Sequence, residues 1–554
     1  MDQRRDDRRP NPNRDPRQPR AGGNGRGPRD SRGGNTPRDP RDPRNPRDGR
    51  DSRGDRSGGG RPGDYRSQSN PAPRPAPAPT PVSAAVVQSG VPHGAREGGW
   101  LPDWVYTGEK FETGLAFFAD ALGRITRFSR EPADLAAARR LSGQAALPGL
   151  VNTHSHAFHR VLRGRAEARG RPETGPRGAW REAHDRALGR LSGEDVFDVA
   201  RMTFMEMLLA GITCVGEFHY VHHQPDGTPW PEPNFLSCEI LRAAHDVGIR
   251  IALLHVAQVR ADFLAPSGSA PVRSRCAGPE VYLRELEALR VVIEKDFPAD
   301  EAWLGVAPYS LATVPLDAFK AIATYARAQR LRLHTHVATS AAEAAACTAE
   351  YGRAPVALLA EQGVLDKRFT AVDANYLSDD EVKLLGTARA AVCVCPGSAR
   401  NLGLPPAPVE KIIAAGAGVA FGSDTQAQID LLADARSLEY DLRLQRDQRP
   451  ALAPDAATAL FHAATVTGAR SLGATSGALE VGRPADFFTV NLLDPSVAGA
   501  DAGTLLANVV YGLDRRAIRD VWVGARQRLS GGRHVSHGSI VGRFVDAQKR
   551  IWAE

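Results

Sequence analysis

The chain has 554 residues, of which 42% are hydrophobic, enough for a large core in one or more domains. The net charge of +7 comes from residues 1–82, which contain 20 arginines and 11 aspartates but no lysine or glutamate, so the rest of the chain carries a net charge of −2. This balance excludes a strongly basic nucleic-acid-binding surface as a general property of the globular part.

The six cysteines include no CxxC pair, which favours free thiols in a reducing, cytoplasmic setting. The N-terminal sequence lacks the apolar core of a signal peptide, and no apolar stretch is long enough to cross a bilayer. We therefore expect a cytoplasmic protein without a membrane partner.

Residues 1–92 form a low-complexity segment. They repeat Arg-Asp-Pro and Arg-Gly and then become rich in Pro and Ala, with almost no aliphatic residue before Val82. Such a composition cannot bury a core, so we expect this segment to be disordered. Its Arg/Gly-rich part would contact RNA only weakly, through phosphates, and a solubilising extension is the favoured interpretation.

Residues 147–476 alternate apolar, β-rich runs with helical patterns such as 195–209 and 279–294. The eight apolar runs, the first of which starts one residue earlier, occupy residues 146–152, 213–218, 250–256, 302–307, 331–337, 369–374, 390–395 and 418–423. Eight strands alternating with helices predict an α/β fold with a (β/α)8 TIM-like barrel. A doubly wound sheet or a fourfold repeat fits this count less well.

Short strand patterns flank the barrel region on both sides. Residues 93–146 contain them at 104–107, 115–118 and 125–128. Residues 477–554 contain them at 477–491 and 521–524, after a helical stretch at 456–467. We expect the two ends of the chain to pair in one small composite β-sandwich domain.

A candidate metal site follows three of the predicted strands. His154 and His156 are two residues apart at the end of the first strand, so their side chains point to the same face. His336 ends the fifth strand, and Asp424 follows the eighth inside Gly-Ser-Asp. Active-site groups of parallel barrels gather at the carboxyl ends of the strands. We therefore expect these four side chains to bind one divalent metal, preferably Zn²⁺, with iron or manganese as alternatives.

Other strand ends also carry polar side chains. They are Glu217, His219 and Tyr220 at the second strand, Tyr309 and Ser310 at the fourth, His334 and Thr339 at the fifth, and Asp373 at the sixth. A divalent ion lowers the pKa of bound water towards about 7. Asp424 could both bind the ion and accept the proton of that water.

These motifs resemble the ligand pattern of the amidohydrolase superfamily and, within it, the formimidoylglutamate deiminase branch. The supporting stretches are residues 154–158 (His-Ser-His-Ala-Phe), 180–181 (Trp-Arg), 217–223 with 225–227, and 401–403 (Asn-Leu-Gly). The resemblance implies a barrel with a β-sandwich domain, one zinc ion, hydrolysis of a C–N bond in a small molecule and, by analogy, a homodimer. It also implies that Arg181 and Tyr220 contact the substrate.

Several positions depart from that branch. The family's fifth-strand glutamate, which carries protons between water and the leaving ammonia, is replaced by Thr339, and its sixth-strand histidine by Asp373. The fourth-strand His-Ser-Leu-Arg motif, whose arginine binds the substrate carboxylate, reads Tyr309-Ser-Leu-Ala312. His159 stands in place of a glutamine. A threonine cannot carry a proton at neutral pH, so the ligand set is kept while the proton carrier and the carboxylate contact are changed.

We therefore expect a metal-dependent hydrolase of the deiminase type that acts on a substrate other than N-formimino-glutamate. Asp424 is the expected base, and Asp373 or His159 the substitute proton donor. Tyr309 is expected to contact the substrate together with Arg181 and Tyr220. Two alternatives remain: a catalytically impaired, metal-binding relative with a regulatory or scaffolding role, and an RNA-associated protein whose N-terminal segment is the active part.

Overall fold

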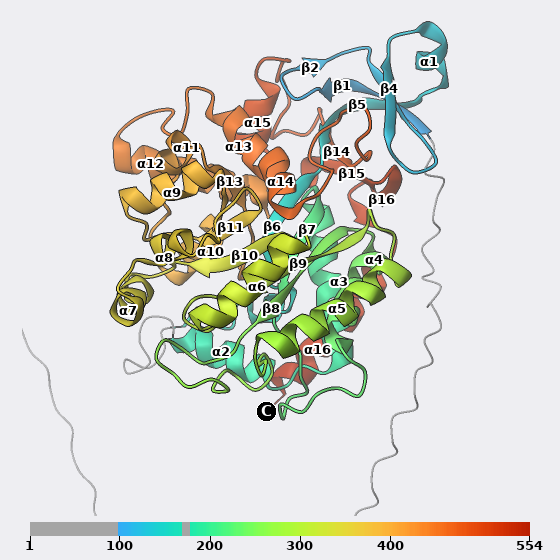
Figure 1. The fold of residues 1–554 in the computed structure, drawn as a ribbon. Coiled ribbons are helices and arrows are strands. Elements are labelled where there is room, and N and C mark those ends of the chain that lie inside the picture. Colours follow the sequence, from blue (N-terminus) through green and yellow to red (C-terminus); the bar gives the residue numbers. More distant parts are fainter. Residues whose placement is uncertain (1–97, 169–177, 554) are drawn as a thin grey trace, which may run out of the picture. The chain divides into compact units, whose positions relative to one another are not determined.

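The computed structural model describes residues 98–168 and 178–553. The disorder expected for residues 1–92 and the start of the expected N-terminal β-segment, residues 93–97, lie outside these ranges. Two sheets, one of eight and one of nine strands, organise the described residues (Figure 1).

Eight parallel strands form a central barrel, in which each strand neighbours the next one in the chain. They are β6 (Leu150–Ser155), β7 (Ile212–His219), β8 (Arg250–Ala257), β9 (Ala302–Pro308), β10 (Leu333–Val337), β11 (Phe369–Asp373), β12 (Ala391–Val394) and β13 (Gly418–Phe421). A parallel bridge between Ser155 and Asp424 joins the end of the first strand to the segment after the last, so the ring is nearly closed. The predicted (β/α)8 barrel is confirmed.

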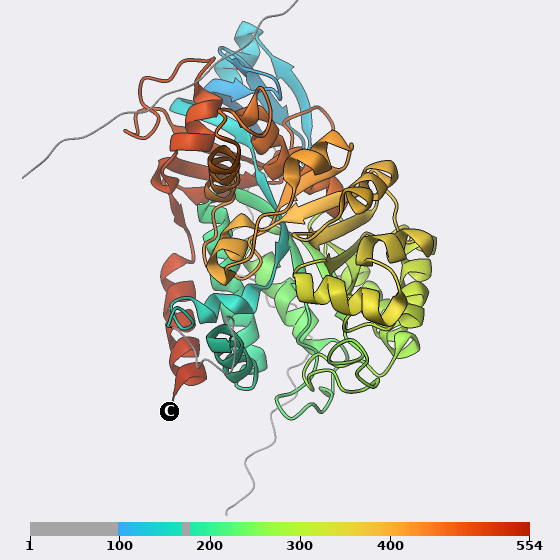
Figure 2. The same cartoon turned by 90° about the vertical axis from the view of Figure 1, so that its left-hand side faces the viewer.

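Helices alternate with these strands and surround them (Figures 1 and 2). They are η1 (Ala157–Leu162), α2 (Gly178–Leu188), α3 (Gly193–Leu209), α4 (Phe235–Val247), α5 (Pro279–Asp296), α6 (Leu316–Ala328), α7 (Ala341–Tyr351), α8 (Pro355–Glu361), α9 (Asp379–Ala388), α10 (Pro396–Leu402), α11 (Val409–Ala414), α12 (Leu431–Arg446), α13 (Ala456–His462), the π-helical η3 (Ala463–Thr467) and α14 (Gly468–Leu472). Capping boxes at Ser192 and Ser378 fix the starts of α3 and α9.

The nine-stranded sheet combines both ends of the described chain. Its strands are β1 (Gly98–Tyr106), β2 (Phe111–Glu112), β3 (Ala116–Ala119), β4 (Ile125–Ser129), β5 (Arg139–Pro148), β14 (Phe487–Asn491), β15 (Ile518–Val523), β16 (Arg526–Ser530) and β17 (Arg533–His534). Antiparallel pairing of β5 with β14 joins the N-terminal strands to the C-terminal ones. Trp100, Phe117, Phe487 and Trp522 form the aromatic centre of its buried cluster. The expected composite β-domain is confirmed.

Gly149 separates the two sheets, so the single strand expected over residues 146–152 is wrong. Residues 146–148 belong to β5 in the composite sheet, and β6 of the barrel begins at Leu150. A Cβ atom at position 149 would lie 2.1 Å from Thr213 Oγ1, so only glycine lets the chain pass here. Pro148-Gly149 therefore ends one sheet and starts the other.

The last helix, α16 (His537–Trp552), packs against α3 on the outside of the barrel. Ion pairs from Arg543 to Asp198 and from Arg550 to Asp195 hold it there. Three shorter elements, α1 (Pro132–Ala137), α15 (Leu505–Gly512) and η4 (Arg515–Ala517), complete the fold. None of the helices that the structure describes is long and apolar enough to span a bilayer.

Candidate metal centre

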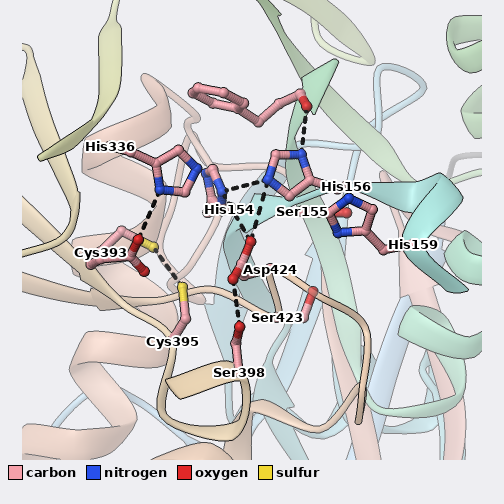
Figure 3. Close-up of polar contacts among 12 residues, drawn as sticks. His154, Ser155, His156, His159, His336, Cys393, Cys395, Ser398, Ser423 and Asp424 are labelled. Carbon is pink, nitrogen blue, oxygen red and sulfur yellow. Dashed lines mark hydrogen bonds and ion pairs between the residues drawn. The ribbon is translucent and has the colours of Figure 1, made fainter. Parts of the chain in front are cut away.

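Four buried side chains converge at the carboxyl ends of the barrel strands (Figure 3). His154 lies on β6, His156 directly after it, His336 on β10, and Asp424 after β13. One ligand atom from each lies within 4.8 Å of the ligand atoms of the other three. The structure thus brings together the four metal ligands predicted from the sequence.

The spacing of the ligand atoms matches what one tetrahedral ion requires. His154 Nε2 lies 3.2 Å from His156 Nε2, and Asp424 Oδ1 lies 3.6 Å and 3.3 Å from these two atoms. Ligand atoms about 2.1 Å from a tetrahedral ion are about 3.4 Å apart. His336 Nε2 is buried and has no hydrogen-bond partner in the described chain, as expected of an atom that faces a metal. The side chains therefore fit a single divalent ion.

Neighbouring groups fix which nitrogen of His156 and of His336 faces the centre. His156 Nδ1 lies 2.8 Å from the carbonyl oxygen of Phe218, and His336 Nδ1 lies 2.9 Å from Asp373 Oδ2. Ser398 Oγ donates to Asp424 Oδ2 at 2.5 Å, which leaves Oδ1 for the metal. Such outer contacts orient metal ligands and tune their basicity.

Electrostatics leave His154 and Asp424 in forms suited to a cation. Burial lowers the pKa of His154 well below its usual value, so the ring is neutral. Burial alone would raise the pKa of Asp424, but hydrogen bonds with His154 and His156 hold it well below its usual value. Burial also opposes a charge on His336, yet Asp373 outweighs burial and raises the pKa of this ring. An ionised carboxylate and a neutral imidazole therefore meet at one point.

Two of the acidic groups sit on strained backbone. Asp373 and Asp424 have φ angles of 69° and 43°, in the left-handed region that costs a non-glycine residue roughly 1–3 kcal/mol. Asp373 ends β11 and Asp424 follows β13; the Asp424 carboxylate belongs to the ligand group, and that of Asp373 contacts the outer nitrogen of His336. Strain of this kind is typical of functional sites.

Aromatic and imidazole rings form one wall of the site. Tyr220 OH lies 2.8 Å from His159 Nε2 and 2.7 Å from His184 Nε2, and His184 Nδ1 lies 2.9 Å from Asp185 Oδ1. The rings of His159 and His156 are 4.6 Å apart. The structure therefore places the predicted His159 and Tyr220 beside the metal ligands, in a hydrogen-bonded chain that leads outward to Asp185.

Tyr309 also lies at the centre, whereas Arg181 does not. The Tyr309 ring is 5.1 Å from that of His336 and 5.8 Å from that of Tyr220. Arg181 lies on the exposed face of α2. At the position of the absent arginine, the backbone oxygen of Ala312 accepts a hydrogen bond from Arg260, whose guanidinium is already paired with Glu350.

Asp373 and Thr339 occupy adjacent places beside His336. Asp373 Oδ2 accepts hydrogen bonds from both His336 Nδ1 and Thr339 Oγ1, each at 2.9 Å. Two of the residues that depart from the deiminase pattern therefore contact one another. Both act here on the orientation of a metal ligand.

Sequence reasoning missed three side chains at this centre. They are His184, Ser398 and Glu343. His184 lies four residues after Trp180 on one helix, and the two rings stack 5.1 Å apart, so the helical spacing could have indicated it. Ser398 and Glu343 lie on helices that follow strands, where a sequence pattern alone suggests only solvent contact or capping.

The Glu217 carboxylate fixes the turn that follows β6. It accepts hydrogen bonds of 2.6 Å from Ser155 Oγ and from the backbone N–H of Ala157, on either side of His156. Burial raises the pKa of Glu217 to about 8. Gln426 donates to Ser155 Oγ at 2.9 Å and completes this buried network.

The amidohydrolase family model matches residues 145–535. The chain belongs to the amidohydrolase family. This amidohydrolase is 35% identical over 420 residues to formimidoylglutamate deiminase of Pseudomonas aeruginosa, across 75% of its own length and 91% of that relative. It is also 28% identical over 384 residues to 5'-deoxyadenosine deaminase of Methanoregula boonei, covering 68% of its own length and 77% of that protein.

Solved structures agree with the fold. An amidohydrolase from Brucella melitensis superposes with a TM-score of 0.76 and 28% identity, over 82% of this amidohydrolase and 100% of that chain. An adenosine deaminase from Xanthomonas campestris with bound zinc has a TM-score of 0.69 at 22% identity, over 82% of this chain and 98% of that one. The barrel and its composite β-domain are therefore those of the amidohydrolase family.

Proposed function

We propose that this amidohydrolase is a metal-dependent enzyme that hydrolyses a C–N bond in an amidine or imine, by attack of water and release of ammonia. The observation that carries the proposal is the spacing of His154, His156 and Asp424 with the unpartnered Nε2 of His336. Relatives named as a deiminase and as deaminases support C–N hydrolysis.

The four ligands would hold one divalent ion, with zinc preferred because three imidazoles and one carboxylate suit it. When bound, such an ion supplies a water whose pKa is lowered to about 7. On sequence grounds Asp424 would also accept a proton from that water. On sequence grounds the donor to the leaving nitrogen is Asp373 or His159.

The substrate is proposed to differ from N-formimino-glutamate. Ala312 replaces the arginine that would pair with a substrate carboxylate, and Arg260 beside it is already engaged by Glu350. Tyr220 and Tyr309 line the wall of the site with hydroxyl groups that stay neutral, because burial raises the pKa of both. Arg181 would reach the substrate only from the rim. These features favour a substrate that lacks the carboxylate with which an arginine at position 312 would pair.

A catalytically impaired, metal-binding relative is the second candidate. Thr339 favours it, because a hydroxyl replaces the acid/base glutamate of the deiminase branch. In that case the protein would bind metal and release no ammonia from any substrate.

The experiment is a screen of zinc-loaded protein against amidines, imines, lactams and N-acyl amino acids, with ammonia or acid release as the readout. We expect turnover of at least one amidine or imine, lost in His154→Ala together with the bound metal. The matched control is His462→Ala, at the end of α13 and outside the ligand group. If wild-type protein carries metal and turns over no compound of these classes, the impaired relative is the better description.

A further inference from the structure

Glu343 is a half-buried residue near the metal centre whose buried carboxylate oxygen Oε1 no expected role accounts for. It lies in the first turn of α7, four residues after Thr339. Its Oε2 accepts a hydrogen bond of 3.0 Å from the backbone N–H of Thr339. Its Oε1 is buried and has no hydrogen-bond partner in the described parts of the chain. An unpartnered, buried carboxylate oxygen is costly, so its retention needs a reason.

The Glu343 carboxylate is close enough to act electrostatically on two groups of the site. Its charge raises the pKa of His336 and of Tyr309, after the larger effects of burial and of nearer carboxylates. In turn, burial raises the pKa of Glu343, although its backbone hydrogen bond and the charge on His336 oppose this. Glu343 is not part of the ligand group itself. It thus lies next to the ligands without binding the ion.

Asp373 and His159, the two proton donors suggested by the sequence, already have hydrogen-bond partners, whereas Oε1 of Glu343 has none in the described parts of the chain. Asp373 Oδ2 already accepts from His336 and from Thr339. A proton on Asp373 would remove the acceptor that orients a metal ligand. His159 is engaged by Tyr220 and lies on the opposite side of the ligand group, against His156.

We infer that Glu343, entering from α7, is the acid/base group that carries protons between the attacking water and the leaving nitrogen, in place of the glutamate absent at position 339. The inference rests on the proposed C–N hydrolysis. It gives Glu343 the proton transfers that the proposed function assigned to Asp424 and to Asp373 or His159, and leaves Asp424 as a metal ligand. The proton balance needs no co-reactant beyond water and the substrate.

For a C=NH substrate, hydrolysis requires the transfer of two protons from water to the leaving nitrogen. Water forms the new C–O bond and gives one proton to the Glu343 carboxylate, which passes it to the nitrogen as the C=N double bond becomes single. The second proton of the former water then moves by the same carboxyl group to the nitrogen as the C–N bond breaks. The products are a C=O group and ammonia, and Glu343 returns to its starting form.

The competing explanation for Glu343 is helix capping. Ser340 is the N-cap of α7 and accepts from the Glu343 N–H, while the Glu343 carboxylate accepts from the N–H of Thr339. Capping needs only an acceptor oxygen, which glutamine also supplies. Glu343→Gln therefore keeps the cap and removes the proton carrier. Glu361→Gln, an exposed glutamate on α8, is the matched control.

The test compares wild type, Glu343→Gln, Glu343→Asp and Glu361→Gln on a substrate identified by the screen. We expect kcat of Glu343→Gln to fall about 10²–10⁴-fold, with KM, metal content and melting temperature near those of wild type. Glu343→Asp should recover part of the loss, because it restores a carboxyl group. The Glu361→Gln control should match wild type.

A second readout does not depend on turnover. In protein labelled with ¹³C at the glutamate carboxyl carbon, Glu217 should give one signal that titrates above the ordinary range of glutamates, and Glu217→Gln assigns it. A second raised signal should remain in Glu217→Gln and disappear in Glu343→Gln. Wild-type turnover together with full activity and an unchanged pH profile in Glu343→Gln would overturn the inference. Absence of any turnover in metal-loaded wild type would instead overturn the proposed function on which it rests.

Discussion

Asp373 Oδ2 lies 2.9 Å from Nδ1 of His336, the ring whose Nε2 faces the metal centre. The same oxygen accepts a hydrogen bond from Thr339. In the deiminase branch, the positions of Asp373 and Thr339 are expected to hold a histidine and a glutamate, respectively. Their replacement here has produced a carboxylate–imidazole pair that orients a metal ligand. We therefore expect these two residues to support metal binding rather than proton transfer.

Asp373→Asn should weaken metal binding. An amide in place of the carboxylate is a poorer acceptor for the His336 N–H, and loss of such outer contacts costs about 10–100-fold in metal affinity. Competition with a chromophoric chelator measures this change directly. Asp380→Asn, at an exposed position on α9, serves as the control. Equal affinities in all three proteins would show that Asp373 does not support the ligand.

Removing the metal should lower the melting temperature of the folded protein. A ligand at 100 times its dissociation constant stabilises the native state by about 2.7 kcal/mol. Elemental analysis of purified protein should find one divalent ion per chain, and scanning calorimetry before and after chelation should show the stability difference. His336→Ala should melt at the same temperature with and without added zinc.

Wild-type protein should hydrolyse N-formimino-glutamate poorly, and Ala312→Arg should improve it. A new guanidinium could pair with the substrate carboxylate through two charge-assisted hydrogen bonds. We expect kcat/KM for this substrate to rise by at least about tenfold, which corresponds to about 1.4 kcal/mol of binding. Ala312→Gln, similar in length but neutral, is the control. A rise of the same size in Ala312→Gln would argue against a carboxylate contact.

The stability of metal-free protein should depend on pH through Glu217. Its pKa is raised from 4.5 to about 8 by burial, so the folded state holds this proton more tightly than the unfolded state. Unfolding releases the proton between these two values. The free energy of unfolding should therefore fall as the pH rises from about 4.5 to about 8.

Glu217→Gln should remove that part of the pH dependence, because the amide resembles the protonated acid. Denaturant unfolding of wild type and variant at pH 5 and pH 9 measures it. The variant should gain stability relative to wild type at the higher pH. Parallel curves for the two proteins would mean that Glu217 is ionised in the folded state.

Much of the barrel and its ligand group could be predicted from the sequence. Apolar runs mark buried parallel strands because both faces are covered, and the ends of these runs located His154, His336 and Asp424. The switch of sheets at Gly149 could not be found this way, because the apolar run continues through it. Only the close approach of Thr213 makes this glycine necessary.

Side chains that reach the centre from helices were harder to predict. Glu343 occupies a position that the sequence describes equally well as a capping glutamate. Its burial depends on how α7 packs after Thr339, a tertiary relationship that no local pattern records. His184 reaches Tyr220 from α2, on a segment far from any barrel strand in the sequence.

The hydroxyl of Tyr220, which lies between two imidazoles, links the tautomer of His159 to the charge on His184. A phenol donates one hydrogen bond, and the hydrogen bond with His184 lowers the pKa of Asp185, so Asp185 is an ionised acceptor. With His184 neutral, its Nε2 accepts from Tyr220, the phenol oxygen accepts from His159 Nε2–H, and His159 Nδ1 keeps a free lone pair. With His184 protonated, its Nδ1–H still donates to Asp185, but its Nε2–H now donates to Tyr220, Tyr220 donates to His159 Nε2, and the proton of His159 moves to Nδ1. The side chain of Asp185 is 77% exposed, so a proton taken up at the surface would turn an acceptor beside the metal ligands into a donor, without the movement of any side chain.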